Sequence, residues 1–107
     1  MAYADRNRGV FVLLGDAECQ EGAVWEAAMF AGKHQLNNLV AIVDCNGYGA
    51  TPSNRPTTEW DWDKLGWCHC FPVDGHNIDA LSLEIGSGYM KPLLVKANTI
   101  KGNGISF

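Results

Sequence analysis

Two short polar segments stand directly behind apolar runs of this sequence and contain the residue types that bind metal ions. The first, "GDAECQEG" at residues 15 to 22, follows "GVFVLL" and carries Asp16, Glu18 and Glu21. The second, "DCNGY" at residues 44 to 48, completes the run that starts "LVAIV". Carboxylate and amide oxygens are ligands that Mg²⁺ takes in proteins, usually together with phosphate oxygens and water. Both segments are therefore candidates for chemistry.

The elements around these segments follow from hydrophobic patterning. Residues 10–14 and 39–45 are continuous apolar runs, as expected for strands covered on both faces, and residues 92–100 repeat this more loosely. Residues 22–35 and 77–85 have helical spacing, with Asn77 as a candidate cap of the second helix. Strands that alternate with helices predict an α/β fold, a parallel sheet flanked by helices.

The remaining segments are shorter. Residues 47–58, rich in Gly, Pro, Asn and Thr, predict a loop, and the tryptophan-rich segment at residues 59–67 predicts a short helix. Residues 69–76 predict a short edge strand, because Pro72 cannot donate to a ladder. The helix at 22–35 is apolar nearly all round, so we expect it to be buried and Glu26 to have a partner, either in this chain or in another.

Composition excludes several classes of protein. The 107 residues fit one domain, and a net charge of −4 with scattered Lys and Arg argues against binding to nucleic acid or to a membrane surface. No apolar run is long enough to span a bilayer, and the first residues lack a secretory signal, so we expect a cytoplasmic protein. The four cysteines are expected to be reduced thiols, and the Cys68-His69-Cys70 triplet is not expected to bind metal.

The two polar segments gain meaning from their predicted place in the sheet. Ligands of open parallel sheets bind beyond the carboxyl ends of the strands, where Asp16 and Asn46 would lie on consecutive strands. Gly15 would permit a tight turn, and the following helix start would offer amide hydrogens to a phosphate. Separately, a Gly-Asp pair is commonly only a turn and an Asn-Gly pair only a loop. Together they predict a magnesium site for a diphosphate, completed by a backbone carbonyl.

A Gly-Asp pair with an Asn about thirty residues later resembles the thiamine-diphosphate signature. The intervening "ECQEGAVWEAAMFAGKHQLNNLVAIVDCNG" is similar to transketolase well beyond that signature, as are "GWCHCFPVDGHNIDAL" and "KPLLVKANTIKGNGISF". The resemblance covers essentially all of the chain and corresponds to the second part of the amino-terminal cofactor domain. It implies that residues 1–107 are a single partial thiamine-diphosphate-binding domain that takes thiamine diphosphate and Mg²⁺.

The resemblance also assigns residues to the cofactor. It implies that Asp16 and Asn46 hold magnesium through their side chains and Tyr48 through its carbonyl. Gly15 and Ala17 flank Asp16 in the same turn, and both are implied to bind the cofactor. Ala17 occupies the place of a second glycine, whose amide the family uses on the diphosphate. Alanine keeps the amide but tolerates positive φ poorly. Ile100 falls where the family has an apolar contact to the cofactor.

The acidic residues of the first helix have a different implied place. Glu21, counted with the cofactor site, and Glu26 match acidic residues that the family packs at its subunit interface, which links paired active sites. That interface would supply the partner of Glu26, with a local Lys or Trp as the alternative. Glu18 is expected to be solvated near the helix start, favoured there by the helix dipole.

The sequence contains no residue at a family catalytic position. His34, His69 and His76 match none, the segment 101–104 leads in the family to a histidine beyond Phe107, and the glutamate that activates the cofactor lies in a pyrimidine-binding domain of another subunit. We therefore expect no activity from this chain alone. The resemblance implies ketol transfer between sugar phosphates once a complementing subunit supplies that domain.

Two alternatives remain open. The chain could be a non-catalytic remnant that acts as an interaction module, as Ala17 would favour. It could also be part of a related thiamine enzyme, such as a dihydroxyacetone or deoxyxylulose phosphate synthase. In every case we expect a sheet with an unprotected edge and an apolar face, and hence association with a second copy or with a partner.

Overall fold

The computed structural model describes residues 1–46, 62–69, 72–86, 88 and 90–100 and has the predicted α/β architecture. The expected strands at 10–14, 39–45 and 92–100 and the expected helices at 22–35 and 77–85 are all confirmed, with small shifts of their ends. Its elements are β1 (Val10–Gly15), η1 (Glu18–Gln20), α1 (Gly22–Lys33), β2 (Leu39–Cys45), η3 (Trp62–Leu65), β3 (Cys68–His69), β4 (Val73–Asp74), α2 (Ile78–Gly86) and β5 (Leu93–Asn98).

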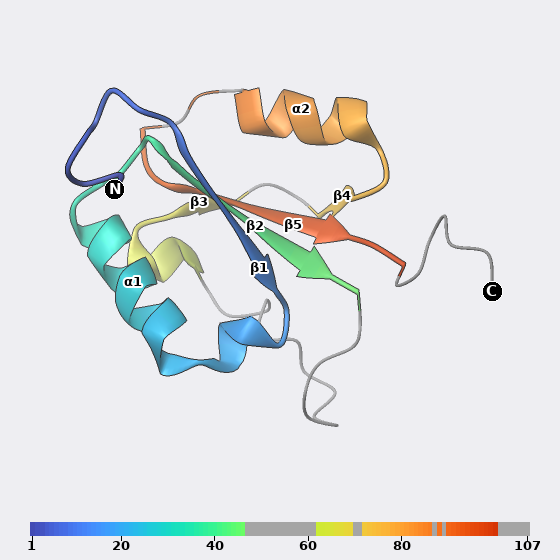
Figure 1. Cartoon of the computed structure of the whole chain (residues 1–107), viewed down its shortest axis with the longest axis horizontal. Helices are drawn as coiled ribbons and strands as arrows, with labels where there is room; N and C mark the ends of the chain where they lie inside the picture. Colours follow the sequence, from blue (N-terminus) through green and yellow to red (C-terminus); the bar gives the residue numbers. More distant parts are fainter. Residues whose placement is uncertain (47–61, 70–71, 87, 89, 101–107) are drawn as a thin grey trace.

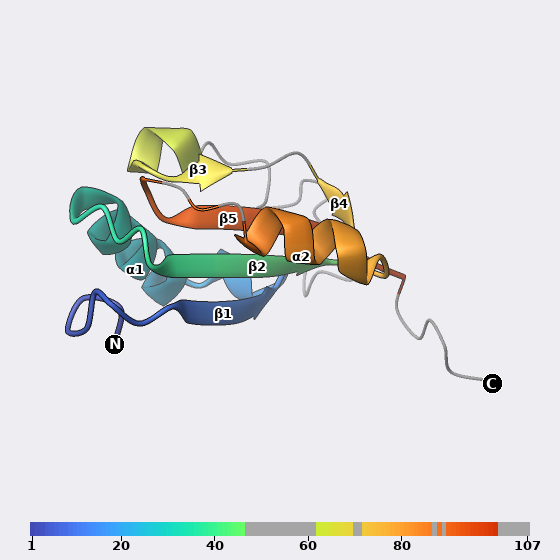
Figure 2. The same cartoon turned by 90° about the horizontal axis from the view of Figure 1, so that it is seen from above.

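The five strands form one parallel sheet in the order β1-β2-β5-β3, with β4 also pairing with β5 (Figures 1 and 2). Crossovers of this kind need helices on the sheet faces. Figure 1 shows α2 above the sheet and α1 below it, so the two helices cover opposite faces. The region of the expected edge strand at 69–76 contains two separate short strands, β3 and β4, and Pro72 lies outside both. Within the tryptophan-rich segment, Trp62–Leu65 form the 3₁₀ helix η3, and the predicted loop at 47–58 lies outside the described residues.

Each face of the sheet has its own apolar cluster. On the α1 side, Ala28 and Ala31 pack with Val43, Leu94 and the tryptophans of the η3 region. On the α2 side, Leu93 and Val95 are the buried centre, and Leu81 of α2 packs against them. Alternate residues of β5 thus serve the two faces, which is why this strand reads as a continuous apolar run.

The contact of α1 with η3 depends on two glycines. A Cβ on Gly32 would stand 1.6 Å from the carbonyl oxygen of Leu65, so only glycine fits there. Gly66 has a φ of +86°, a conformation that glycine adopts without strain. Trp67 closes the junction by donating its Nε1 hydrogen to the carbonyl of Ala28 at 2.8 Å.

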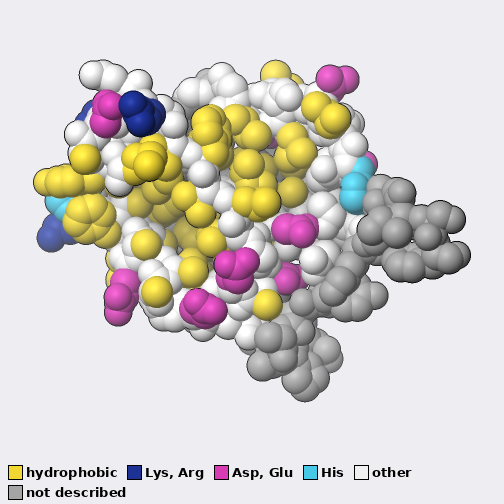
Figure 3. Space-filling view, viewed as in Figure 1, with side chains coloured by type: hydrophobic (Ala, Val, Ile, Leu, Met, Phe, Trp, Pro, Cys, Tyr) yellow, Lys and Arg dark blue, Asp and Glu magenta, His cyan; other side chains and the backbone are white. Residues whose placement is uncertain are grey.

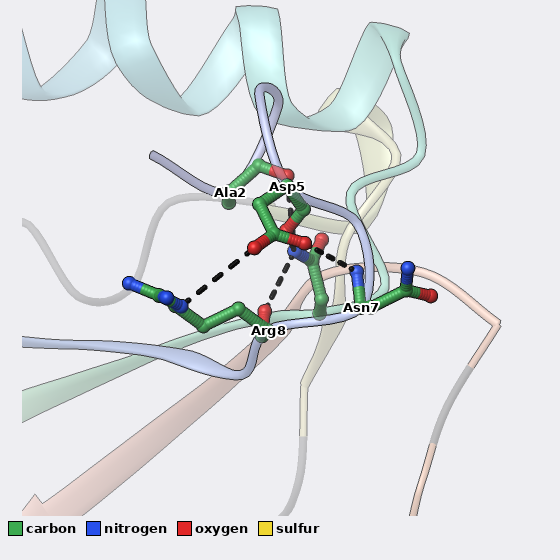
Figure 4. Close-up of polar contacts among 5 residues, drawn as sticks. Ala2, Asp5, Asn7 and Arg8 are labelled. Atoms are coloured by element: carbon green, nitrogen blue, oxygen red, sulfur yellow. Dashed lines mark hydrogen bonds and ion pairs between the residues drawn. The ribbon is translucent and has the colours of Figure 1, made fainter.

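The first residues of the chain are held at the amino ends of the strands by a polar network (Figure 4). Asn38 donates its Nδ2 hydrogens toward the carbonyls of Ala2, Asp5 and Arg8 at 3.0, 3.1 and 2.9 Å. The Asp5 carboxylate accepts the Asn7 amide hydrogen at 3.1 Å and lies 3.7 Å from the Arg8 guanidinium. This network sets where β1 starts, because the carbonyl of Asn38 also accepts the Val10 amide hydrogen.

Two expectations about burial are wrong for the single chain. β1 is not covered on both faces, since Phe11 and Leu13 on one face are 60% and 73% exposed. Helix α1 buries only the face carrying Ala28, Ala31 and Gly32, and Glu26 is exposed. The first follows from the sheet order, which puts β1 at an edge with no described strand beyond it. The second follows because α1 packs on the sheet through one face only, and Glu26 does not belong to that face. In Figure 3, which is viewed with β1 toward the reader, hydrophobic side chains gather on this side of the molecule.

The described part of the chain contains no helix that is both long and apolar enough to cross a membrane.

Candidate functional site

The polar segments singled out in the sequence meet at one edge of the sheet. Because β1, β2 and β5 are parallel and adjacent, Asp16, Asn46 and Thr99 all follow strand ends on the same side. The register places Gly15 opposite Asp44, and Asp44 opposite Ala97. The convergence predicted from the sequence is therefore present.

The turn after β1 differs in detail from the prediction. Gly15 is the last residue of β1 and is not among the described glycines with positive φ, so its conformational freedom is not what the turn uses. Ala17 has φ −66° and ψ −36°, an ordinary right-handed conformation. Alanine in place of the second glycine therefore carries no backbone strain in this structure.

Hydrogen bonds define the position of Asp16. Its amide hydrogen is donated to the carbonyl of Asp44 at 3.2 Å, which ties the end of β1 to β2. Its Oδ1 accepts the amide hydrogen of Ala17 at 2.8 Å. The amide that the resemblance assigns to the diphosphate is thus turned toward the Asp16 carboxylate.

Glu18 has a more specific place than the solvated one expected. It is exposed, but its Oε1 accepts the amide hydrogen of Gly15 at 3.0 Å. It opens the 3₁₀ turn η1, which stands between Asp16 and α1. Helix α1 starts six residues after Asp16, at Gly22, as predicted from the sequence, and η1 fills part of the segment between them.

Asp44 is the residue of this edge that the sequence reasoning missed. Its Oδ1 accepts the hydroxyl hydrogen of Thr99, and its Oδ2 accepts an Nδ2 hydrogen of Asn46 at 3.4 Å. It is half-buried at the end of β2. The available signal was the acidic residue itself, which closes an otherwise apolar strand where a buried carboxylate needs donors.

The β5 end of the site contains Ile100, whose side chain is 70% exposed. Its amide hydrogen is donated to Nε2 of His76 at 2.9 Å, and the amide hydrogen of His76 is donated to Asp74 Oδ1 at the same distance. His76, which matched no family catalytic position, is thus a support for the backbone at Ile100.

One thiol lies beneath this edge. Cys19 is fully buried in η1, and burial raises its pKa to about 11, with Cys45, Asp16 and Glu18 adding to the shift by their negative charge. The neutral thiol is therefore the form present at physiological pH. Cys19 is a packed core residue here, because a reactive thiol would need the opposite shift.

Other expected site residues are not brought together with Asp16 and Asn46. Glu21 is exposed at the N-cap of α1 and makes no side-chain cap hydrogen bond. Glu26 is exposed on α1 and belongs to the outer face of that helix rather than to the strand ends. Tyr48 and the segment 101–104 lie outside the described residues.

The donor set at the strand ends has the chemistry of a hard-cation site. It offers the Asp16 carboxylate and the Asn46 amide on adjacent strands, linked through the backbone and side chain of Asp44. Among the described residues no group of three or more His, Cys, Asp or Glu side chains could hold a metal ion. A carboxylate and an amide oxygen are two of the ligand types that Mg²⁺ takes, together with phosphate, main-chain or water oxygens.

Comparisons with known proteins agree with this geometry. Residues 3–106 match the family described as transketolase, thiamine diphosphate binding domain. The chain is 38% identical over 106 residues to the 6-deoxy-6-sulfo-D-fructose transketolase subunit SqwG of Clostridium sp. (strain MSTE9), covering 92% of this chain and 38% of that one. It is 39% identical over 102 residues to human transketolase, covering 91% of this chain and 16% of that one.

Solved structures give the same result. A transketolase from Campylobacter jejuni superposes with a TM-score of 0.71 at 28% identity, over 92% of this chain and 17% of that one. A transketolase variant from Pichia stipitis gives 0.73 at 29% identity, over 90% and 15%. The chain thus spans well under half the length of these relatives. With the family match covering nearly every residue, the chain belongs to the transketolase family, within its thiamine-diphosphate-binding domain.

Proposed function

We propose that this chain is the magnesium-binding and diphosphate-binding part of a transketolase-like enzyme that transfers ketol groups between sugar phosphates. The observation that carries the proposal is the convergence of Asp16 and Asn46 at neighbouring strand ends, tied together through Asp44. A hard-cation donor set beyond the carboxyl ends of a parallel sheet is where such folds bind nucleotide-like ligands. Thiamine diphosphate, when bound, would supply the nucleophilic carbon that accepts the ketol group.

The contribution of this chain is binding and orientation. Asp16 and Asn46 would hold Mg²⁺, with the carbonyl of Tyr48 as a third ligand. Gly15 and Ala17 would face the diphosphate, which requires the Ala17 amide hydrogen to leave Asp16 Oδ1 and point outward. Ile100 would contact the cofactor through its exposed side chain, and Glu21 would lie where the site meets another subunit.

A complementing chain is part of the proposal. The resemblance to transketolase places the glutamate that activates the cofactor in a separate pyrimidine-binding domain, and the Clostridium relative is itself named a subunit of a transketolase. We propose that the pyrimidine-binding domain is supplied within a homo-oligomer or by a separate complementing subunit. We expect this assembly to lie in the cytoplasm. The chain by itself would bind the cofactor and not turn over.

The direct test is calorimetric titration of thiamine diphosphate into the purified chain, with and without Mg²⁺. Binding should require Mg²⁺, and Asp16→Ala should weaken it at least tenfold, because the carboxylate ligand of the proposed site is lost. Asp79→Ala is the matched control, since Asp79 is an exposed carboxylate on α2, and it should bind as wild type does. Unchanged binding by Asp16→Ala would reject the metal site.

The apolar surface provides a second test. Phe11 and Leu13 are exposed on one face of β1, while Val12 and Leu14 line an apolar groove of about 260 Å³ on the other, against Ala23 and Ala27 of α1. Such surfaces mark interaction sites. We expect the chain to self-associate or to capture its complementing subunit, and a strict monomer in sedimentation at micromolar concentration, alone and with that subunit, would contradict this.

The remnant alternative makes the opposite prediction for the cofactor. Absence of Mg²⁺-dependent binding both alone and with the complementing subunit, combined with retained association, would favour an interaction module. The ordinary backbone of Ala17 removes one argument for that alternative, because the substitution leaves the local conformation unstrained. A related thiamine enzyme is distinguished by its sugar substrates once the complemented assembly is assayed.

A further inference from the structure

The Asp44 side chain lies at the centre of the candidate site and touches the ends of two other segments. Asp44 Oδ1 accepts the Thr99 hydroxyl hydrogen, although the two residues are 55 positions apart, and Oδ2 accepts from Asn46 Nδ2 at 3.4 Å. The main-chain carbonyl of the same residue accepts the Asp16 amide hydrogen at 3.2 Å. One residue therefore holds the carboxyl ends of β1, β2 and β5 in a common arrangement.

Both oxygens of this carboxylate are already occupied by donors, which separates its role from that of a metal ligand. An ionised carboxylate accepts hydrogen bonds and donates none, so the Asn46 group that faces it must be the NH₂ end of the amide. The two ends of a planar primary amide point in divergent directions. With Nδ2 held by Asp44, Oδ1 of Asn46 is directed away from Asp44.

We propose that Asp44 is a positioning residue that sets which end of the Asn46 amide is presented to the cation, with Thr99 holding the Asp44 carboxylate in place. This rests on the proposed function, since the cation is the one that Asp16 and Asn46 would share. An amide that presents NH₂ to Mg²⁺ repels it, whereas the carbonyl oxygen binds it. Partners that orient metal ligands typically change affinity 10-fold to 100-fold when they are removed.

The variant that isolates this role is Asp44→Asn, which preserves the size of the side chain. The new amide can still accept from the Thr99 hydroxyl through its oxygen, but its NH₂ group would then face the NH₂ group of Asn46. The Asn46 amide relieves the donor–donor conflict by turning over. We expect the Kd for Mg²⁺ at saturating thiamine diphosphate to rise about 10-fold to 100-fold, with a smaller change in the Kd for thiamine diphosphate at saturating Mg²⁺.

Thr99→Val is the matched control. It removes the hydroxyl that holds Asp44 but leaves the Asp44–Asn46 hydrogen bond possible, so the expected rise in the Kd for Mg²⁺ is below about 10-fold. A general effect of loosening the strand ends would instead affect both variants equally. Equal effects of the two variants would therefore contradict orientation of the amide as the mechanism.

A second measurement does not depend on the cofactor. In the isotope-labelled chain without metal, NMR should show a nuclear Overhauser contact between an Asn46 Nδ2 hydrogen and the Asp44 Cβ hydrogens, and slowed exchange of one Asn46 side-chain amide hydrogen. Both signals should persist in Thr99→Val and vanish in Asp44→Asn. Rapid exchange and no such Overhauser contact in the wild-type chain would overturn the proposal, even if Asp44→Asn proved unable to fold.

The two measurements separate the proposals. If wild-type protein shows the NMR signals but binds neither Mg²⁺ nor thiamine diphosphate, the proposed function is contradicted, and so is the effect of Asp44 on the Kd for Mg²⁺. The orientation of Asn46 by Asp44 would still stand. Wild-type binding that is matched within about twofold by Asp44→Asn overturns the positioning role, for which a change of at least about 10-fold is expected, and leaves the proposed function intact.

Discussion

β1 and β5 have similar apolar sequences and opposite surroundings. "VFVLL" in β1 and "LLV" in β5 both predict strands covered on two faces. In β5, Leu94 and Val95 are completely buried, whereas Leu13 of β1 is 73% exposed. β5 lies between β2 on one side and β3 and β4 on the other, with α1 and α2 packed over its two faces; among the described strands β1 has one neighbour, and one of its faces is open.

The difference shows what a continuous apolar run does and does not encode. An apolar run predicts that both faces of the strand are buried, but it does not show whether the helices or strands that bury them belong to the same chain. For β5 this chain supplies them. For β1, the exposed Phe11 and Leu13 together with the apolar groove beside α1 are the surfaces on which we propose that another chain packs.

The largest expected effect comes from truncating the same residue type in both strands. Leu94→Ala should lower the free energy of unfolding by about 2–5 kcal/mol, because it opens a cavity in the buried sheet. Leu13→Ala should change it by at most about 0.5 kcal/mol in the isolated chain. Urea unfolding followed by circular dichroism measures both, and similar losses in the two variants would contradict the assignment of β1 as an open edge.

A glycine pair in α1 extends the comparison to a helix. Gly32→Ala should lower the free energy of unfolding by up to about 3 kcal/mol, since the new Cβ would overlap the Leu65 carbonyl oxygen and force α1 away from η3. Gly22→Ala, at the open first turn, meets no atom within 4 Å and should be neutral or stabilising by up to about 1 kcal/mol. Thermal unfolding of the two variants tests this, and a tolerated Gly32→Ala would show that the junction yields.

The buried thiol gives a pH dependence. Burial raises the pKa of Cys19 from 9.0 to about 11, so folding favours the protonated thiol. The contribution of this thiol to the free energy of unfolding is complete below pH 9 and is lost as the pH rises through 11. The reason is that Cys19 ionises at a lower pH in the unfolded chain than in the folded one. Between about pH 8 and pH 11, we expect the free energy of unfolding to fall by about 2 kcal/mol more in wild type than in Cys19→Ala. Parallel pH profiles for the two proteins would contradict the burial of this thiol.

The sequence predicted local features well and long-range ones poorly. The bounds of β2 were predicted without error, and the sheet-edge convergence of Asp16 and Asn46 followed from the parallel order of the strands. The link from Asp44 to Thr99 was not predictable, because it joins residues far apart through a register that only the folded sheet defines. The exposure of Glu26 was missed for a different reason: the helix is apolar nearly all round, so the sequence does not show that only one of its faces is covered within this chain.

The conformation after β1 was also mispredicted, for a local reason. A glycine before an acidic residue suggested a turn with unusual φ, but Glu18 holds the Gly15 amide instead, and the chain enters a 3₁₀ turn through ordinary dihedral angles. A side chain that accepts a nearby backbone hydrogen can replace the glycine conformation that a motif suggests. The pattern of residue types therefore predicts the position of such a turn more reliably than its backbone angles and hydrogen bonds.

The smallest expected effect concerns α2, which has no buried residue although it covers β5. Asn77 was predicted as its cap, and its Oδ1 accepts the amide hydrogen of Ala80 at 3.0 Å. Asn77→Ala should cost about 1 kcal/mol, whereas Asn77→Asp keeps the acceptor and adds a charge that suits the helix dipole. Because α2 is held by few buried contacts, the loss should appear as faster hydrogen exchange in α2 with little change in β5. Equal acceleration in both elements would mean that α2 and the central strand unfold as one unit, and that the lightly buried helix is as firmly part of the core as β5 itself.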